Sequence, residues 1–217
     1  MAVEVAVKAA VGNPDILGDC PFSQRVLITL EEKHIPYTKK LIDLSNKPQW
    51  YLEANPAGKV PALKTADGWL ADSDEITKKL EQDYPEPSLV TPPEKASVGS
   101  KIFPSFVGFL KSDDPQDGKQ EALLTELEAL DKALSEGEGP FIAGSKITQV
   151  DVALIPKLYH TKVALKALKG WEIPAKLENV HKYVKAATET ESFQKTTASD
   201  DLIVKGWLAH DGVKKQI

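Results

Sequence analysis

The chain has 217 residues, a formal net charge of −5 at pH 7 and one cysteine. This length is enough for one domain or two small ones with a sizeable core, and the acidic balance argues against a nucleic-acid binder, which usually presents a basic patch. No apolar run approaches the roughly 18 residues of a membrane span, the N-terminus lacks signal-peptide or transit-peptide character, and a single cysteine excludes an internal disulfide. We therefore expect a soluble cytoplasmic protein without stable membrane association.

A strand, a helix and a second strand are predicted at the start of the chain. Valines alternate with other residues over residues 2–8, which is the period of a strand, and residues 37–44 are predicted to form a second strand. Between them, residues 13–18 predict a loop, and apolar residues at helical spacing predict a helix from Pro21. This order indicates a βαβ unit with parallel strands. His34 is expected to end the helix and to be structural.

The chain's only cysteine lies where this helix begins. Pro21 suits the first helical turn, which places Cys20 at or next to the N-cap. The unpaired N–H groups and the positive end of the helix dipole favour a thiolate there, whereas the carboxylate of Asp19 opposes it. From these residues alone, a reactive thiolate and a small buried cysteine both remain open.

A hairpin and a second helix are predicted next. A turn at residues 55–58 leads into a third strand at residues 59–63, and the Asp-Gly pair at 67–68 indicates a hairpin. Asp72 or Ser73 is then expected to cap a helix with acidic residues in its first turn.

A proline-rich passage divides the chain. Residues 85–93 are predicted to be a linker between an N-terminal domain at residues 1–84 and a C-terminal domain at residues 94–217. Beyond the linker the apolar spacing is helical, and Thr148 to Asp151 form a variant of the capping box. The second half is therefore predicted to be all-helical, with an apolar stripe made by Leu123, Leu127, Leu130 and Leu134.

Short pieces of the sequence resemble the soluble glutathione transferases. They are Cys20-Pro21-Phe22-Ser23, the run from Asn55 to Pro61, Asp72-Ser73, and the box from Thr148 to Asp151. Within that superfamily, DCPFSQRV and KVPALK are similar to plant dehydroascorbate reductases, and the resemblance covers the whole chain. It implies a thioredoxin-like α/β domain followed by an all-helical domain. It also implies reduction of dehydroascorbate to ascorbate by a monomer that uses glutathione as co-substrate and holds no permanently bound cofactor.

The resemblance implies a glutathione site made by Lys47, Val60, Pro61, Asp72 and Ser73. A cis peptide before Pro61 would leave the N–H and C=O of Val60 free for the cysteinyl part of glutathione; trans is the commoner form, and only the resemblance favours cis. Ser73 at a helix N-terminus suits the γ-glutamyl carboxylate and Asp72 the ammonium group, although an ordinary cap uses the same residue types. Lys47 is expected to attract an anionic group.

For dehydroascorbate, the resemblance implies a site made by Lys8, Asp19, Phe22, Ser23, His160 and Trp207. Simple packing is the alternative for the histidine and the tryptophan, and solvated surface is the alternative for the lysines. The family commonly has a lysine three residues after this tryptophan, where the present chain has His210. The histidines show no metal-ligand spacing, so no metal site is predicted.

The single cysteine leads to a mechanistic hypothesis. Because no second cysteine exists to close an internal disulfide, the reducing equivalents must come from an external thiol. Cys20 is expected to be the catalytic nucleophile and to pass through a mixed disulfide with glutathione, while Asp19 donates a proton or orients the substrate. The same residues leave three other functions open: a general glutathione-dependent thiol transferase, a membrane-inserting protein like the chloride intracellular channel proteins, and a non-enzymatic ligand carrier.

Overall fold

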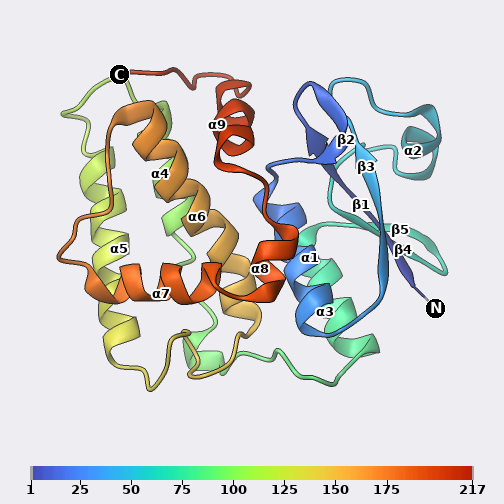
Figure 1. Ribbon diagram of the computed structural model, residues 1–217, viewed down its shortest axis with the longest axis horizontal. Helices are drawn as coiled ribbons and strands as arrows, with labels where there is room; N and C mark the ends of the chain where they lie inside the picture. The colour runs from blue at the N-terminus through green and yellow to red at the C-terminus, as the bar shows by residue number, and fades with distance from the viewer. Residues whose placement is uncertain (1, 217) are drawn as a thin grey trace.

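The computed structural model describes residues 2–216 and has a sheet-containing part and a helical part that lie side by side (Figure 1). The first part contains β1 (Val3–Ala10), β2 (Asn13–Leu17), α1 (Pro21–Glu32), β3 (Tyr37–Ile42), α2 (Gln49–Ala54), β4 (Ala62–Thr65), β5 (Gly68–Ala71) and α3 (Ser73–Asp83). The second contains the 3-10 helix η1 (Pro93–Lys95), α4 (Ile102–Lys111), α5 (Lys119–Ser135), α6 (Gln149–Lys169), α7 (Glu178–Thr188), α8 (Glu191–Thr196) and α9 (Asp200–Leu208). The predicted fold class is confirmed. Within residues 2–216, no helix is long and apolar enough to cross a membrane.

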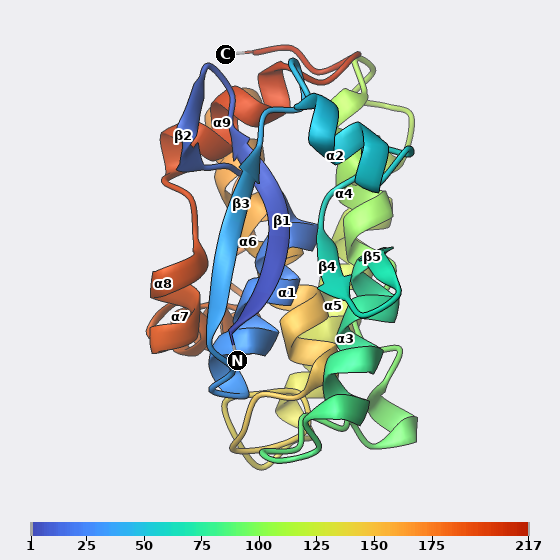
Figure 2. The ribbon, with the colours of Figure 1, turned by 90° about the vertical axis from the view of Figure 1, so that its right-hand side faces the viewer.

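The alternation of side chains along β1 determines which helices cover each face of the sheet. β1 pairs in parallel with β3, as predicted, and antiparallel with β4, which pairs with β5. Val5 and Val7 of β1 pack with α1 and α3 on one face, whereas Ala6 packs with Tyr51 of α2 on the other. Figure 1 shows α1 and α3 between the sheet and the helical part, and Figure 2 shows the molecule with the sheet toward the viewer.

The prediction of a loop at residues 13–18 is wrong, because most of these residues form the strand β2. This strand pairs antiparallel with the end of β1 after a turn in which Gly12 has a φ of +75°. Its Asn-Pro-Asp sequence has low strand propensity, so pairing with β1 rather than local preference makes it a strand. The short helix α2 is also absent from the prediction, since six residues are too few to show a helical period.

Helix α1 is the element at which the two parts meet. Its predicted apolar residues Val26, Leu27 and Leu30 are buried under the sheet, while Ile28 belongs to the core of the helical part. His34 follows the C-cap residue Lys33 and has a φ of 53°, which is not helical and confirms that α1 does not continue past it. Because α1 also packs along α6, its first turn lies at the junction of the two parts.

The helical part is organised by a buried carboxylate at the start of α6. The predicted capping box is confirmed: Asp151 accepts hydrogen bonds from the N–H of Thr148 at 2.9 Å and from the N–H of Ile142 and the hydroxyl of Tyr183, both at 3.0 Å. These bonds offset the burial that raises the pKa of Asp151. The predicted leucine stripe is buried in α5. These contacts hold α6 beside α1. The middle of α6, which carries His160, lies near the N-terminus of α1.

Candidate active site

Cys20 is the N-cap residue of α1, as the sequence predicts. It has an extended backbone, Pro21 follows it as the first helical residue, and its Sγ accepts a hydrogen bond from the N–H of Ser23 at 3.4 Å. The sulfur is therefore held at the end of the helix where free N–H groups point outward. The thiol is partly exposed, so an external thiol or a small substrate has access to it.

A cavity of about 490 Å³ opens beside Cys20 between the two parts of the molecule. The sheet-containing part supplies the predicted residues Lys8, Asp19, Phe22, Lys47 and Val60. The helical part supplies Phe103, Lys111, the predicted His160 and Trp207, and His210. Lysines outnumber carboxylates among the residues that line the cavity. The cavity therefore suits a polar ligand that carries negative charge or several carbonyl oxygens.

Lys8 and Asp19 form an ion pair beside Cys20. Their Nζ and Oδ1 atoms are 2.8 Å apart, and both side chains are largely buried. Helix α9 lies directly behind the carboxylate, because a Cβ atom added to Gly206 would be 1.8 Å from Oδ2 of Asp19. The missing side chain at Gly206 therefore makes the space in which the Asp19 carboxylate lies.

Ser23 does not reach the cavity. Its side chain is buried, and its hydroxyl accepts a hydrogen bond from the N–H of Lys8 at 3.4 Å. This contact joins β1 to α1 behind Cys20. The placement argues against the substrate contact that the sequence analysis expects of Ser23, because the hydroxyl is covered by the protein.

His160 and Trp207 are joined by a hydrogen bond at the base of the cavity. The indole Nε1–H donates to Nδ1 of His160 at 3.1 Å, and burial, with a smaller effect from Lys8, lowers the pKa of His160 to about 3. The imidazole is therefore neutral at physiological pH. Because Nδ1 is the acceptor, this hydrogen bond assigns the ring proton to Nε2, so the ring retains one N–H donor.

The residues expected to bind glutathione lie along one rim of the site. The Val60–Pro61 peptide is cis, and within residues 2–216 the N–H and C=O of Val60 make no hydrogen bond with protein groups. Lys47 lies beside Val60 on the cavity wall. Asp72 caps α3 by accepting the N–H of residue 74 at 2.8 Å, and buried Ser73 opens that helix. Asp72 and Ser73 do not line the cavity that contains Cys20.

Comparisons with known proteins place this arrangement in a family. Models of the glutathione S-transferase N-terminal and C-terminal domains match residues 17–88 and 113–186. The protein named probable glutathione S-transferase DHAR1, cytosolic, of Oryza sativa subsp. japonica is 60% identical over 208 residues, which cover 95% of this chain and 97% of that protein. The protein named glutathione S-transferase DHAR2 of Arabidopsis thaliana is 58% identical over 207 residues, which cover 95% of this chain and 97% of that protein.

A solved structure agrees with these relatives. The crystal structure of Chlamydomonas reinhardtii dehydroascorbate reductase matches with a TM-score of 0.87 and 38% identity, covering 97% of this chain and 99% of that chain. The chain belongs to the plant dehydroascorbate reductases of the glutathione transferase superfamily. The family resemblance stated from the sequence is thus confirmed.

Several residues of this reductase site have no role in the sequence analysis. Phe103 and Lys111 of α4 line the cavity, but their helix shows only an ordinary apolar pattern. Gly206 could have been noticed in the sequence, because glycine is unfavourable inside a helix and is often found there where another group packs closely against the backbone. Within the described residues, no group of three or more His, Cys, Asp or Glu side chains is placed to hold a metal ion.

The burial of His160 predicts a pH dependence of stability in this reductase. The folded state holds a neutral ring down to a pKa of about 3, whereas the unfolded chain takes up a proton near the ordinary value of 6.5. As the pH falls from about 7.5 to 5, His160 binds a proton in the unfolded state but not in the folded state. This difference lowers the free energy of unfolding by about 2 kcal/mol.

Urea unfolding of the wild type and His160→Gln at both pH values measures this contribution. We expect the loss between the two pH values to be about 2 kcal/mol smaller in His160→Gln. The control is His181→Gln, which removes an exposed histidine and should leave the pH dependence close to that of the wild type. Equal losses in the wild type and His160→Gln would contradict a neutral, buried ring.

Proposed function

We propose that the chain reduces dehydroascorbate to ascorbate with two molecules of glutathione, and so serves ascorbate recycling and antioxidant defence. The observation that carries the proposal is the thiol of Cys20 at the N-terminus of α1, facing a lysine-rich cavity between the two parts. The relatives support it, since the Chlamydomonas protein is named a dehydroascorbate reductase and the plant relatives are named glutathione S-transferases.

The proposed reaction uses Cys20 as the only protein thiol. Its thiolate attacks a carbonyl carbon of dehydroascorbate, and a glutathione thiolate then attacks the sulfur. The carbon–sulfur bond breaks, ascorbate leaves with the electron pair and takes up protons, and a Cys20–glutathione disulfide remains. A second glutathione attacks this disulfide, releases glutathione disulfide and restores the Cys20 thiolate. Two thiols are oxidised for each dehydroascorbate that is reduced.

The residues around the cavity are proposed to orient the two reactants. Lys8 and the neutral His160 supply N–H donors for the oxygens of dehydroascorbate, and the carboxylate of Asp19 holds Lys8 in place or transfers a proton. Phe22 and Trp207 give the substrate ring two aromatic walls.

Glutathione is proposed to bind along the rim of the cavity. The free backbone groups of Val60, next to the cis Pro61, pair with its cysteinyl residue, and Lys47 attracts its glycyl carboxylate. Ser73 receives the γ-glutamyl carboxylate at the start of α3. Asp72 meets the ammonium group with the carboxylate oxygen that does not cap the helix.

We also propose a cytoplasmic monomer without stable membrane association, in which glutathione is a co-substrate rather than a resident cofactor. The name of the rice relative includes the word cytosolic. Within the chain, we propose that residues 85–93 link a glutathione-binding domain at 1–84 to a helical domain at 94–217. This division fits the end of α3 at Asp83 and the start of η1 at Pro93.

The test is a comparison of rates with two acceptors. Ascorbate formation from dehydroascorbate and reduction of a small mixed disulfide are followed at equal glutathione concentration. We expect rapid, glutathione-dependent formation of ascorbate. Reduction of the mixed disulfide without ascorbate formation would assign the site to a general thiol transferase instead, because that reaction uses the same cysteine and the same glutathione site.

A further inference from the structure

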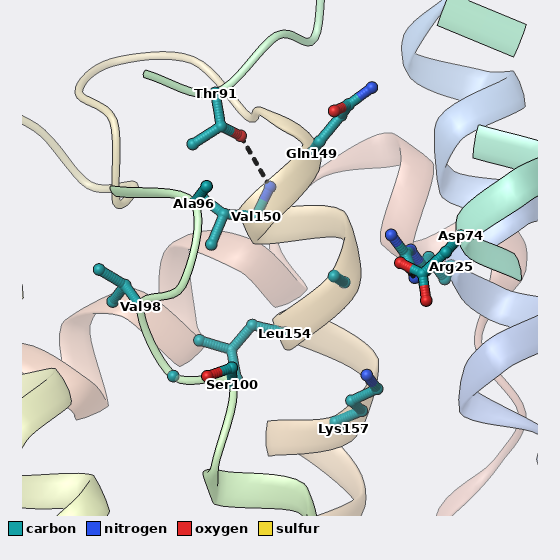
Figure 3. A pocket seen from close by; sticks show the side chains of 12 residues that line it. Arg25, Asp74, Thr91, Ala96, Val98, Ser100, Gln149, Val150, Leu154 and Lys157 are labelled. Atoms are coloured by element: carbon teal, nitrogen blue, oxygen red, sulfur yellow. Dashed lines mark hydrogen bonds and ion pairs between the residues drawn. The ribbon is translucent and has the colours of Figure 1, made fainter. Parts of the chain in front are cut away.

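A second cavity, of about 380 Å³, lies between the two parts (Figure 3). Its walls come from α1, the start of α3, residues 96–100 and the first half of α6. The ammonium of Lys157 lies 5.2 Å from the ring centre of Phe22 and 5.6 Å from that of Phe103. Both rings line the cavity that contains Cys20, so Lys157 lines the second cavity while contacting two residues of the first.

Lys157 is a half-buried cation without a counter-ion. Within residues 2–216 its ammonium makes no ion pair and no hydrogen bond, and its polar contacts are the two aromatic rings. Burial lowers the pKa of Lys157, and the nearby charge of Arg25 lowers it further, with Asp74 acting in the opposite direction. A partly desolvated ammonium of this kind gains more from an added anion than a solvated surface lysine does.

Arg25 connects this cavity to the start of α3. Its Nη1 lies 2.6 Å from the carboxylate of Asp74 and donates to Oγ of Ser73 at 3.4 Å. Its side chain is only 9% exposed, and within the described residues its buried Nε has no hydrogen-bond partner. In Figure 3, Arg25 and Asp74 face the side of α6 that carries Lys157. Two cations and one carboxylate therefore line this cavity, and one of the cations, Arg25, contacts Ser73.

We propose that Lys157, together with Arg25, binds the α-carboxylate of the γ-glutamyl residue of glutathione. This inference rests on the proposed function, in which the thiol of glutathione meets Cys20 and its γ-glutamyl end reaches Ser73. The ammonium of Lys157 lies over the ring of Phe22, two residues after Cys20, and Lys157 lines the same cavity as Arg25 and as Asp74 at the start of α3. The cation is therefore close both to the helix turn that carries the thiol and to the helix start that is proposed to receive the γ-glutamyl end. Ser73 and its helix N-terminus then supply neutral donors, and Lys157 and Arg25 supply the positive charge.

The test measures glutathione binding without turnover. Isothermal titration calorimetry compares the Cys20→Ser variant with Cys20→Ser carrying Lys157→Met, because serine prevents disulfide formation. We expect the Kd for glutathione to rise about tenfold, the effect of losing one hydrogen bond to a charged group. Lys157 donates to no group of the part of the chain that the structure describes, so methionine leaves no partner there unsatisfied, and a thermal melt checks the fold. The matched control is Lys162→Met, which removes an exposed charge from the same helix.

A second ligand identifies the group that Lys157 contacts. γ-Aminobutyryl-cysteinylglycine is glutathione without the γ-glutamyl α-carboxylate. We expect Lys157→Met to leave the Kd for this peptide unchanged. Unchanged glutathione affinity in Lys157→Met, or an equal loss with both peptides, would overturn the inference.

The failure of this inference is distinguishable from a failure of the proposed function. Ascorbate formation by the wild type together with Lys157-independent binding would overturn the inference alone. Lys157-dependent binding without ascorbate formation would overturn the reaction but keep the binding site. An absence of glutathione binding in Cys20→Ser together with an absence of ascorbate formation by the wild type would overturn both.

Discussion

Replacement of Cys20 by serine is expected to abolish the reduction of dehydroascorbate. The proposed reaction oxidises and reduces the Cys20 sulfur in each turnover, and a serine hydroxyl forms no disulfide with glutathione. The chain has no other cysteine that could take over. Serine should retain the N-cap contact with the N–H of Ser23, since serine is a preferred N-cap residue. The loss is therefore expected in activity and not in folding, and ascorbate formation under excess glutathione measures it.

Mass spectrometry of the disulfide between the enzyme and glutathione is the matching control. The wild type, treated with glutathione disulfide, should gain the mass of one glutathione, and Cys20→Ser should gain none. Substantial ascorbate formation by Cys20→Ser would contradict the mechanism. A wild type that carries glutathione but forms no ascorbate would indicate a thiol transferase or a ligand carrier.

Gly206→Ala is expected to lower kcat/KM for dehydroascorbate by about 100-fold, the effect of moving a reacting group by about 1 Å. The added Cβ would lie 1.8 Å from Oδ2 of Asp19, a distance that no real contact tolerates. Either Asp19 or α9 must move, and in both cases the ion pair with Lys8 beside Cys20 is disturbed. Steady-state kinetics at several dehydroascorbate concentrations provide the measurement.

Two further variants test whether this loss acts through Asp19. In an Asp19→Ala background the space behind residue 19 is free, so adding Gly206→Ala should cause little additional loss. Gly108→Ala in α4 is the matched control, because its added Cβ would meet only Lys119 at 3.8 Å and should leave kinetics unchanged. If Gly206→Ala lowers activity equally with and without the Asp19 carboxylate, the glycine supports the fold and not the position of Asp19.

The sequence predicts most of the elements because their signals are local. The cap at Cys20, the box from Thr148 to Asp151 and the leucine stripe of α5 each depend on groups within a few turns of one helix. The same reasoning fails for β2, whose residues disfavour a strand, because its hydrogen bonds come from β1. Likewise, nothing near Ser23 in the chain indicates that its hydroxyl is covered by the backbone of Lys8.

By itself, the sequence determined the fold class and, through its resemblance, the family, and it limited the candidate protein thiol to Cys20, since the chain has a single cysteine. Only the tertiary structure decided how that thiol is surrounded. Asp19 lies against Gly206, and His160 is bonded to Trp207, because α9 returns from the end of the chain to close the cavity. Among residues 2–216, Lys157 finds no counter-ion because α6 carries it into an interface whose facing carboxylate, Asp74, is paired with Arg25. Contacts between segments so distant in the chain depend on packing, and no local pattern of residues encodes them.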